Sequence, residues 1–369
     1  MNQLNPVRAA AIVMLAGVLA SCARPGPEVL TPVATTAPGA RMARVYVATT
    51  RGRAVPDTNV YNSAFAHQVN YGEFTISVPP GHKPGDIEWP LGAPDPAVSF
   101  ATLQQSVLTR AGFAGRIGGG SLKPVNVSVF VHGFNTNFQE ALYRVAQLKA
   151  DAEMEGVPVL FAWPSGARLT GYIADKDAVT YSRDQLVDLL RMLARDREVG
   201  GITVFAHSMG GWLTVEALRQ LRIMGDNAAI ARLNVVLASP DIDVDVFRRQ
   251  MEVLGPLSPP LTVLVSRDDL ALSVSSRLAG LRPRLGALDV NDARVQEIAL
   301  KAKIEIIDIS SLKAPDLLRH DRYASFAAIY PRLTADEHDM RRAGAFVFDG
   351  MGATLAAPFS IPGRMLSGE

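Results

Sequence analysis

One twelve-residue stretch near the middle of the chain constrains the fold more than any other. Residues 202–213 read ITVFAHSMGGWL, and the β-branched and aromatic side chains of the first four predict a short buried strand. A helical pattern begins after Gly211, so Ser208 falls on the turn from strand to helix. Ala206 and Gly210, two residues before and after this serine, are small enough to let the two backbones pass closely.

A serine on such a strained turn is the nucleophile elbow of α/β-hydrolase enzymes. The usual residue two places before the serine is Gly, so the methyl group of Ala206 adds volume where space is scarce. Alone, the motif would also fit a serine in an ordinary strand-to-helix turn. We assign Ser208 as a nucleophile because partner residues follow it in the order that this fold requires.

Length and charge narrow the class of protein. The 369 residues, 48% hydrophobic and 20% charged, are enough for one large α/β core. A net charge of +1, without a basic run, argues against nucleic acid as a partner. The chain contains neither an H-E-x-x-H zinc spacing nor a GxxxxGK[ST] phosphate loop, and we expect no metal and no cofactor.

The N-terminal segment is predicted to be a signal for export. Residues 1–22 contain the apolar run AAAIVMLAGVLA and end in LASC, which resembles the lipobox of bacterial lipoproteins. Cys22 is the only cysteine in the chain, so it has no intramolecular disulfide partner and is free to carry lipid. A simple cleaved signal peptide is the alternative. The residue after the cysteine is Ala23, and a residue other than Asp at this position resembles the signal for sorting to the outer membrane. We therefore expect the protein to be lipid-anchored in the bacterial cell envelope, facing the periplasm or exterior.

The rest of the chain is expected to divide into a tether and one domain. Residues 23–40 are rich in Pro, Ala and Thr and predict an extended tether. Residues 41–369 are expected to form a single domain, with an irregular excursion at 81–120 that contains a helix around 100–111. The apolar tail from residue 343 is broken by Gly and Pro, so we expect it to pack on the domain rather than cross a membrane.

After Pro124 the pattern alternates strands with helices. This alternation predicts a doubly wound, mostly parallel sheet with helices on both faces, and ligand sites beyond the carboxyl ends of the strands.

At one such end, residues 131–137 read VHGFNTN. A His-Gly pair at this place opens the loop that completes an oxyanion hole, here with the backbone N–H groups of Phe134 and Met209. We interpret His132 as a buried residue that shapes the loop, not as the catalytic base.

The catalytic base is found by elimination, because the fold requires the order nucleophile, acid, histidine. Three of the six histidines precede Ser208, and His207 adjoins it with its side chain expected to point away. Of the remaining two, His320 follows the strand KIEIIDIS, whereas His338 lies in the charged run ADEHDMRR, which is typical of a solvated helix face. We therefore assign His320.

The acid should lie on a loop after a strand and ahead of the histidine. LTVLVSRDD supplies Asp268 and Asp269 at this place, and we assign Asp269. Asp241, Asp243 and Asp245 remain alternatives, because some hydrolases take the acid from the preceding strand. Unused aspartates at such loops are expected to cap helices.

Several segments together resemble a known family. They are VHGFNTNFQEAL, FAWPSG with the downstream Tyr172 and Asp175, FAHSMGGWL, ASPDIDVDVF, SRDDLAL and RHDRYAS. The resemblance covers roughly residues 41–333. The resemblance is to the bacterial α/β-hydrolase family of uncharacterised esterase/lipase-like enzymes. It implies Ser208 as nucleophile, His320 as base and Asp269 as acid, but no settled substrate.

These assignments predict a serine hydrolase that cleaves small-molecule or lipid esters through an acyl-enzyme intermediate. The alternatives are an acyltransferase or thioesterase with the same triad, and a binding protein without turnover. Pocket walls are expected from residues 163–172 and from the excursion at 81–120.

Overall fold

The computed structural model describes residues 24–119, 123–152, 156–333 and 346–349. The predicted signal segment with Cys22 and most of the C-terminal tail lie outside the described residues. Within the described ranges, no helix is both long and apolar enough to cross a membrane.

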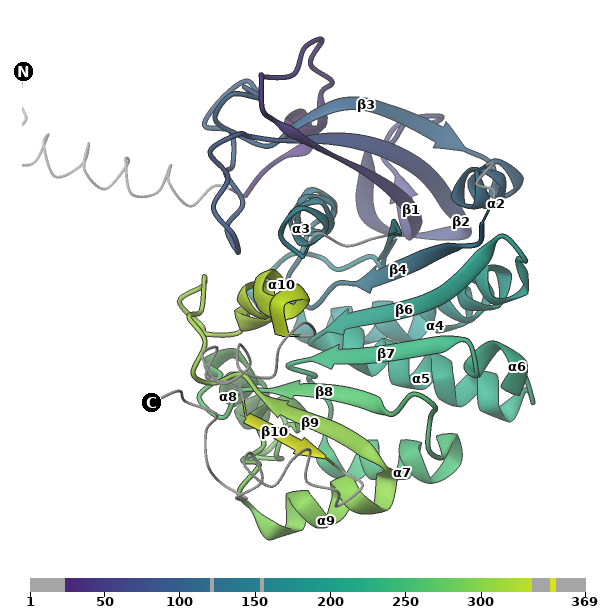
Figure 1. Ribbon diagram of the computed structural model, residues 1–369, viewed down its shortest axis with the longest axis vertical. Coiled ribbons are helices and arrows are strands. Elements are labelled where there is room, and N and C mark those ends of the chain that lie inside the picture. The colour runs from purple at the N-terminus through teal and green to yellow at the C-terminus, as the bar shows by residue number, and fades with distance from the viewer. Residues whose placement is uncertain (1–23, 120–122, 153–155, 334–345, 350–369) are drawn as a thin grey trace, which may run out of the picture.

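The described strands form one mixed sheet in the order β10-β9-β8-β7-β6-β4-β5-β1-β2-β3 (Figure 1). All neighbours from β9 to β1 pair in parallel, whereas β2, β3 and β10 are antiparallel additions at the two edges. The strands are β1 (Arg41–Arg53), β2 (Tyr61–Val78), β3 (Ala101–Leu108), β4 (Val125–Val131), β5 (Val157–Ala162), β6 (Val199–His207), β7 (Leu233–Ala238), β8 (Leu261–Val265), β9 (Ile304–Asp308) and β10 (Phe346–Asp349).

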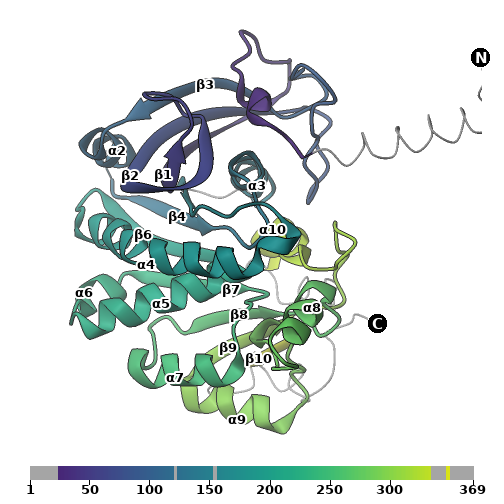
Figure 2. The same ribbon diagram turned by 180° about the vertical axis from the view of Figure 1, so that it is seen from behind.

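Helices cover both faces of this sheet, so the predicted doubly wound α/β fold is confirmed (Figures 1 and 2). On one face lie α3 (Phe138–Asp151) and α10 (Arg322–Leu333). The other face carries α4 (Tyr172–Arg195), α5 (Met209–Ile223), α6 (Asn227–Ile230) and α7 (Val244–Leu254). The remaining helices and 3₁₀ turns are α2 (Arg110–Gly118), α8 (Leu270–Leu278), α9 (Ala293–Ala302), η1 (Pro27–Leu30), η2 (Leu169–Gly171) and η3 (Leu285–Ala287).

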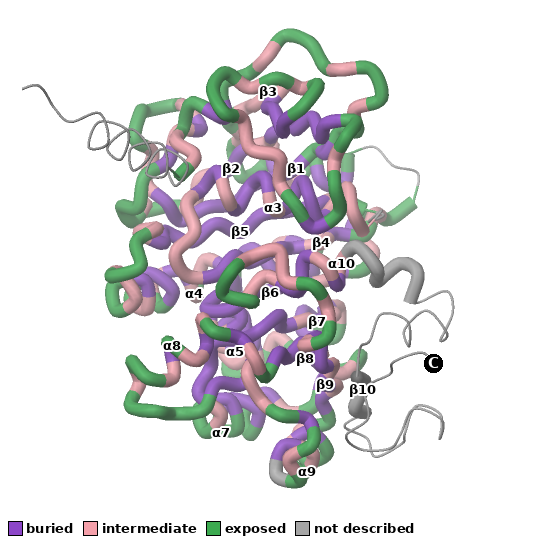
Figure 3. The backbone as a smooth tube through the Cα atoms, turned by 90° about the vertical axis from the view of Figure 1, so that its left-hand side faces the viewer, coloured by how far each residue is buried: buried purple, intermediate pink, exposed green. Residues whose placement is uncertain are grey.

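The strands are buried on both faces because their side chains alternate between two hydrophobic cores. Val127, Val129 and Val131 of β4 pack with the helices α4 and α5. Phe130, between them, packs on the opposite face with residues of α3 and α10. Continuous apolar runs of this kind are typical of central parallel strands. The burial pattern shows buried strands inside a shell of more exposed turns (Figure 3).

The segment expected to be an extended tether packs instead on the domain. Within it, Val29 and Leu30 are each only 5% exposed, and Tyr143 of α3 donates a hydrogen bond of 2.7 Å to the Val29 carbonyl. The Asn137 side chain also donates to the Pro25 carbonyl. These two apolar residues cover the outer side of α3 and β3, so ordered structure begins well before Arg41.

The excursion at residues 81–120 also differs from expectation. The predicted helix at 100–111 is wrong: residues 101–108 form strand β3, and the helix α2 starts at Arg110 behind an N-cap from Thr109. Strand β3 pairs antiparallel with β2 over residues 101–108. This tertiary pairing outweighs the weak local helical pattern of ATLQQSVL.

Candidate active site

Ser208 occupies the turn between β6 and α5. Its backbone angles are φ 53° and ψ −120°, a region that non-glycine residues adopt only when the surroundings enforce it. The enforcing contacts are backbone hydrogen bonds: Ser208 N–H donates to Ala238, and the Ser208 carbonyl accepts from Gly211 and Asp241. The predicted strained turn is therefore present, with the serine at its apex.

Small residues around the turn have the steric role that the sequence suggested. A Cβ atom at Gly210 would lie 2.4 Å from the His132 carbonyl oxygen and 2.5 Å from that of Val131. Both neighbours are backbone atoms, so no side-chain rotation could relieve the clash. Ala206 is fully buried in β6, in register between Val131 and Leu237. The sheet therefore accommodates its methyl group while the turn keeps its shape.

Two of the assigned residues meet across more than fifty positions of sequence. The Nδ1 atom of His320 lies 2.6 Å from Oδ2 of Asp269, and the other oxygen of this carboxylate caps α8 through the Leu272 N–H. The Asp269 side chain is completely buried. Burial lowers the pKa of His320, but the charge and hydrogen bond of Asp269 outweigh burial and raise the pKa to about 9.

The other candidate acids are engaged elsewhere. Asp268 forms a two-oxygen ion pair with Arg322, which, against the effect of burial, lowers the pKa of Asp268 to about 2. Asp241 accepts hydrogen bonds from Tyr172 and Ser275. Asp243 caps α7, as expected of an unused aspartate, and the Asp245 side chain is largely exposed. Among these aspartates, only Asp269 hydrogen-bonds His320 through its side chain.

The loop after β4 lies beside the turn because the sheet order reverses there. After β4 the chain passes through α3 to β5, which pairs with one edge of β4. It then returns through α4 to β6, which pairs with the opposite edge of β4. Because β4 and β6 are parallel neighbours, their carboxyl ends lie side by side. His132 is buried in this loop, where its ring nitrogens contact the carbonyls of Gly133 and Trp163 and its ring stacks on Trp163. Burial lowers its pKa to about 3, consistent with a neutral, loop-shaping residue.

The two residues whose backbone N–H groups are expected to form an oxyanion hole lie at this junction, Phe134 in the loop after β4 and Met209 at the start of α5. Met209 is the first residue of α5, so its N–H has no partner within the helix. In the loop, the two residues after Phe134 are held by side chains. Asn135 N–H donates a hydrogen bond to Asp175, and Thr136 N–H donates one to Ser165. A Cβ atom at Gly133 would lie 3.0 Å from Ser208 Cβ, so only glycine lets the loop approach the serine this closely.

Sequence reasoning missed the buried hydrogen-bond network that holds this loop. Arg51 at the end of β1 donates to the carbonyls of Ser165 and Thr136, and burial lowers its pKa to about 10. Ser165 Oγ in turn donates to Asp175 at 2.6 Å. No local pattern links an arginine at residue 51 to a loop at 136, and only the parallel neighbours β1, β5 and β4 bring them together.

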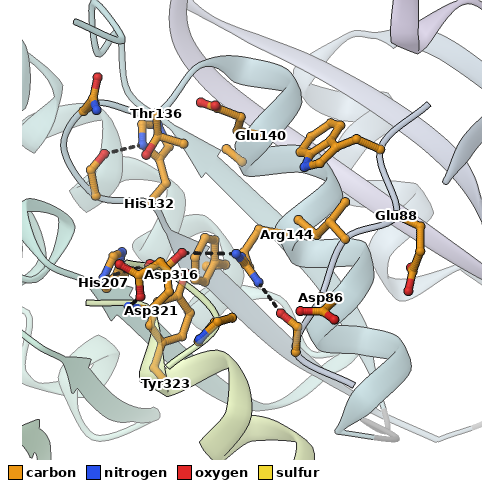
Figure 4. Close-up of a pocket in the computed structure, with 18 of the residues that line it drawn as sticks. Asp86, Glu88, His132, Thr136, Glu140, Arg144, His207, Asp316, Asp321 and Tyr323 are labelled. Atoms are coloured by element: carbon orange, nitrogen blue, oxygen red, sulfur yellow. Dashed lines mark hydrogen bonds and ion pairs between the residues drawn. The ribbon is translucent and has the colours of Figure 1, made fainter. Parts of the chain in front are cut away.

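His207 also departs from expectation, because its side chain does not point away from the site. Its ring centroid lies 4.5 Å from that of His320 and 4.3 Å from that of Tyr323. It lines a cavity of about 620 Å³ next to the loop after β4, with walls from residues 81–89, from α3 and from residues 315–323 (Figure 4). The expected wall from residues 81–120 is present in part, whereas residues 163–172 contribute nothing to this cavity.

This fold, with a serine at the turn after the central strand and a histidine–aspartate pair at the same edge of the sheet, is that of an α/β hydrolase. The chain belongs to the family described as alpha/beta hydrolase of unknown function (DUF900), whose model matches residues 121–337. No curated protein sequence matches the chain.

Solved structures show only distant similarity. A structure of fungal esterases from Rhizomucor miehei is 11% identical, covers 90% of this chain and 91% of its own, and has a TM-score of 0.33. A lipase-esterase related protein from Clostridium acetobutylicum is 14% identical, covers 56% of this chain and 82% of its own, and has a TM-score of 0.24.

Proposed function

We propose that this protein is a serine hydrolase that cleaves carboxylic esters through Ser208, His320 and Asp269. The supporting observation is the 2.6 Å contact between His320 Nδ1 and Asp269, at the carboxyl edge where the strained turn presents Ser208. Because Asp269 takes Nδ1, the other ring nitrogen, Nε2, is free to act as the base.

The reaction has two halves. His320 Nε2 takes the hydroxyl proton as Ser208 Oγ bonds to the ester carbonyl carbon, and the backbone N–H groups of Phe134 and Met209 hold the oxyanion. The C–O bond to the alcohol then breaks, and the alcohol leaves with the proton from His320. Water, deprotonated by the same imidazole, attacks the acyl-serine, and the acid is released as Ser208 regains its proton.

Hydrolysis of a short activated ester tests this function. The wild-type protein should hydrolyse 4-nitrophenyl acetate or butyrate. The Ser208→Ala variant should show no turnover and should keep the melting transition of the wild type. Unchanged activity in Ser208→Ala would refute the assignment. Faster transfer to an added alcohol than to water, or preference for thioesters, would instead indicate an acyltransferase or thioesterase.

We further propose that Cys22 carries the lipid that anchors the protein to the cell envelope. This proposal depends on the LASC sequence and on the absence of any other cysteine. It would place the enzyme at a membrane surface, where both lipid esters and small esters are accessible.

A further inference from the structure

Large apolar side chains are exposed on three short segments at the carboxyl edge of the sheet, residues 168–173, 270–282 and 317–319. Six of them, which we call the apolar rim, lie in α4, in α8 and in the loop before α10: Ile173, Leu270, Val274, Leu278, Leu317 and Leu318. Leu317 is 96% exposed. Exposed apolar side chains that gather in this way mark a surface that contacts another molecule or a membrane.

Hydrogen bonds hold the three segments side by side. The Leu270 N–H donates to the Leu318 carbonyl at 2.9 Å, which joins α8 to the loop before α10. Farther along α8, the Oγ atom of Ser275 lies 3.0 Å from the hydroxyl oxygen of Tyr172, the first residue of α4. The segments are therefore neighbours. They also border the proposed active site, because Leu270 directly follows Asp269.

The outward face of α8 departs from the usual pattern of a surface helix. Leu270, Val274 and Leu278 are spaced four residues apart, so they share one face of the helix, and all three are exposed. Leu272 and Ser275 pack against the domain instead and are buried. A surface helix normally presents polar side chains to water. The apolar outward face of α8 therefore points to a contact outside the domain.

The charges beside the apolar rim are basic. Within its three segments every charged side chain is an arginine: Arg168, Arg277, Arg282 and Arg319. Arg282 and Arg319 pair with aspartates, whereas Arg168 and Arg277 form no ion pair with any described residue. Apolar side chains flanked by free arginines complement an anionic phospholipid surface. A twofold contact between two copies of the rim would instead bring arginines together.

The described chain begins on the same side of the molecule. Arg24 pairs with Glu140, and the Pro25 carbonyl accepts a hydrogen bond from Asn137, the N-cap of α3. Figure 1 shows this end of the chain, α8 and the loop before α10 on the side where the parallel strands end, and Figure 3 looks onto that side. Cys22 is two residues from Arg24, a span of at most about 7 Å. A lipid on Cys22 therefore places the bilayer on the side that carries the apolar rim.

From these observations we infer that the apolar rim docks on the surface of an anionic phospholipid bilayer. Its apolar side chains enter the boundary between headgroups and acyl chains, and Arg168 and Arg277 contact lipid phosphates. Docking turns the carboxyl edge of the sheet, with Ser208, toward the bilayer. The choice of a membrane as the partner rests on the proposed lipid at Cys22, whereas the exposure of the rim does not.

A fluorophore on the apolar rim tests docking directly. Cys22→Ser removes the lipid site and the only cysteine, so an added Leu278→Cys takes a single environment-sensitive dye. Vesicles of phosphatidylethanolamine and phosphatidylglycerol should increase its emission and shift it to shorter wavelength. Ile223→Cys is the matched control, because Ile223 is apolar, 55% exposed and at the opposite end of α5 from Ser208. Its dye should not respond.

Two outcomes of this labelling would overturn the inference. One is an equal response, or no response, at the two positions. The other is a Leu278→Cys dye that a water-soluble quencher cannot reach before vesicles are added. That result would show that another part of the chain, or a second copy, covers the apolar rim.

Substitutions on the apolar rim should weaken docking of the Cys22→Ser protein. Val274→Gln combined with Leu278→Gln should lower vesicle partitioning at least about tenfold, and Arg277→Gln should lower it about fivefold. Ile223→Gln should leave partitioning unchanged. All these side chains are exposed, so the melting transition should persist. Rim variants that partition like the Cys22→Ser protein would refute the docking surface.

Salt and mass analysis separate docking from the proposed lipid anchor. High salt should release most of the Cys22→Ser protein from vesicles, because arginines contribute to docking. If the rim binds vesicles but Cys22 of the mature protein carries no lipid, the docking surface stands and the anchor proposal fails. If Cys22 carries lipid but the dye at Leu278→Cys never responds, the anchor stands and docking is refuted. Hydrolysis of 4-nitrophenyl butyrate in solution tests Ser208 independently of both.

Discussion

His320 and Asp269 form a buried pair in which one carboxylate oxygen lies 2.6 Å from the imidazole Nδ1 and the other caps a helix. The helix therefore fixes the acid, and the acid fixes the histidine. The adjacent Asp268 turns outward onto Arg322 and Arg319 instead. Adjacent residues thus have separate roles, one in the site and one in the loop that supports it.

This difference predicts opposite outcomes for two conservative variants. Asp269→Asn should lower kcat by roughly 10³- to 10⁴-fold, because an amide no longer holds the productive tautomer. Asp268→Asn should lower the melting temperature through its lost ion pairs but change kcat by less than about tenfold. Ester hydrolysis and thermal unfolding of both variants check this. A larger loss of turnover in Asp268→Asn, or in Asp241→Asn, would assign the acid elsewhere.

The raised pKa of His320 predicts the pH dependence of turnover. Only neutral imidazole accepts the Ser208 proton, so kcat/KM should rise with pH and level off above about 9. In Asp269→Asn the partner that raises this pKa is gone while burial remains, so the midpoint should move to lower pH at a lower plateau. A midpoint unchanged by the substitution would contradict the pairing.

The raised pKa of His320 also predicts how the stability of the fold depends on pH. Because the folded pKa of His320 lies above its ordinary value of 6.5, the charged pair contributes its full stability below pH 6.5. The contribution is lost as pH rises through about 9. The stability difference between wild type and Asp269→Asn, measured by chemical denaturation, should accordingly shrink over that range.

Because backbone segments approach closely at the turn, replacing glycine by alanine should destabilise the fold much more at Gly210 than at Gly115. Gly210→Ala places a methyl group against two backbone carbonyl oxygens and should destabilise the fold by about 1–3 kcal/mol or more. Gly115→Ala, in α2, meets no atom within 4 Å and should be neutral or stabilising by up to about 1 kcal/mol. Denaturation curves compare the two. Equal effects would mean that the turn has room for a side chain.

Membrane attachment should depend on a single sulfur atom. Cys22→Ser removes the expected lipid site and should leave ester hydrolysis unchanged while the protein moves to the soluble fraction. Fractionation in high salt separates a lipid anchor from ionic adsorption. A variant that still sediments with membranes would refute lipid attachment at this residue.

The sequence predicted the parallel core well because its signals are local. The strands and helices from β4 to β9 have clear periodicity, and the turn at Ser208 is a short contiguous pattern. Chain order left two histidines, and the position of His320 after a strand selected it. The structure places His320 beside Asp269.

The errors arose where tertiary contacts decide. Strand β3 depends on pairing with β2, and the segment before Arg41 is ordered by contact of Val29 and Leu30 with other elements. The direction of the His207 side chain depends on the neighbouring rings of His320 and Tyr323, which no spacing rule places there. Likewise, Arg51 reaches the loop after β4 only through the sheet.

Covalent labelling tests the central claim most directly, because only an activated serine reacts quickly with a fluorophosphonate. Intact-mass and peptide analysis of the wild type should show one adduct, on Ser208, and prior denaturation should abolish it. Asp269→Asn should label much more slowly, and Ser208→Ala should not label at all. If the folded wild type remains unlabelled, or the adduct maps to another serine, Ser208 is not the nucleophile and the protein is not the hydrolase described.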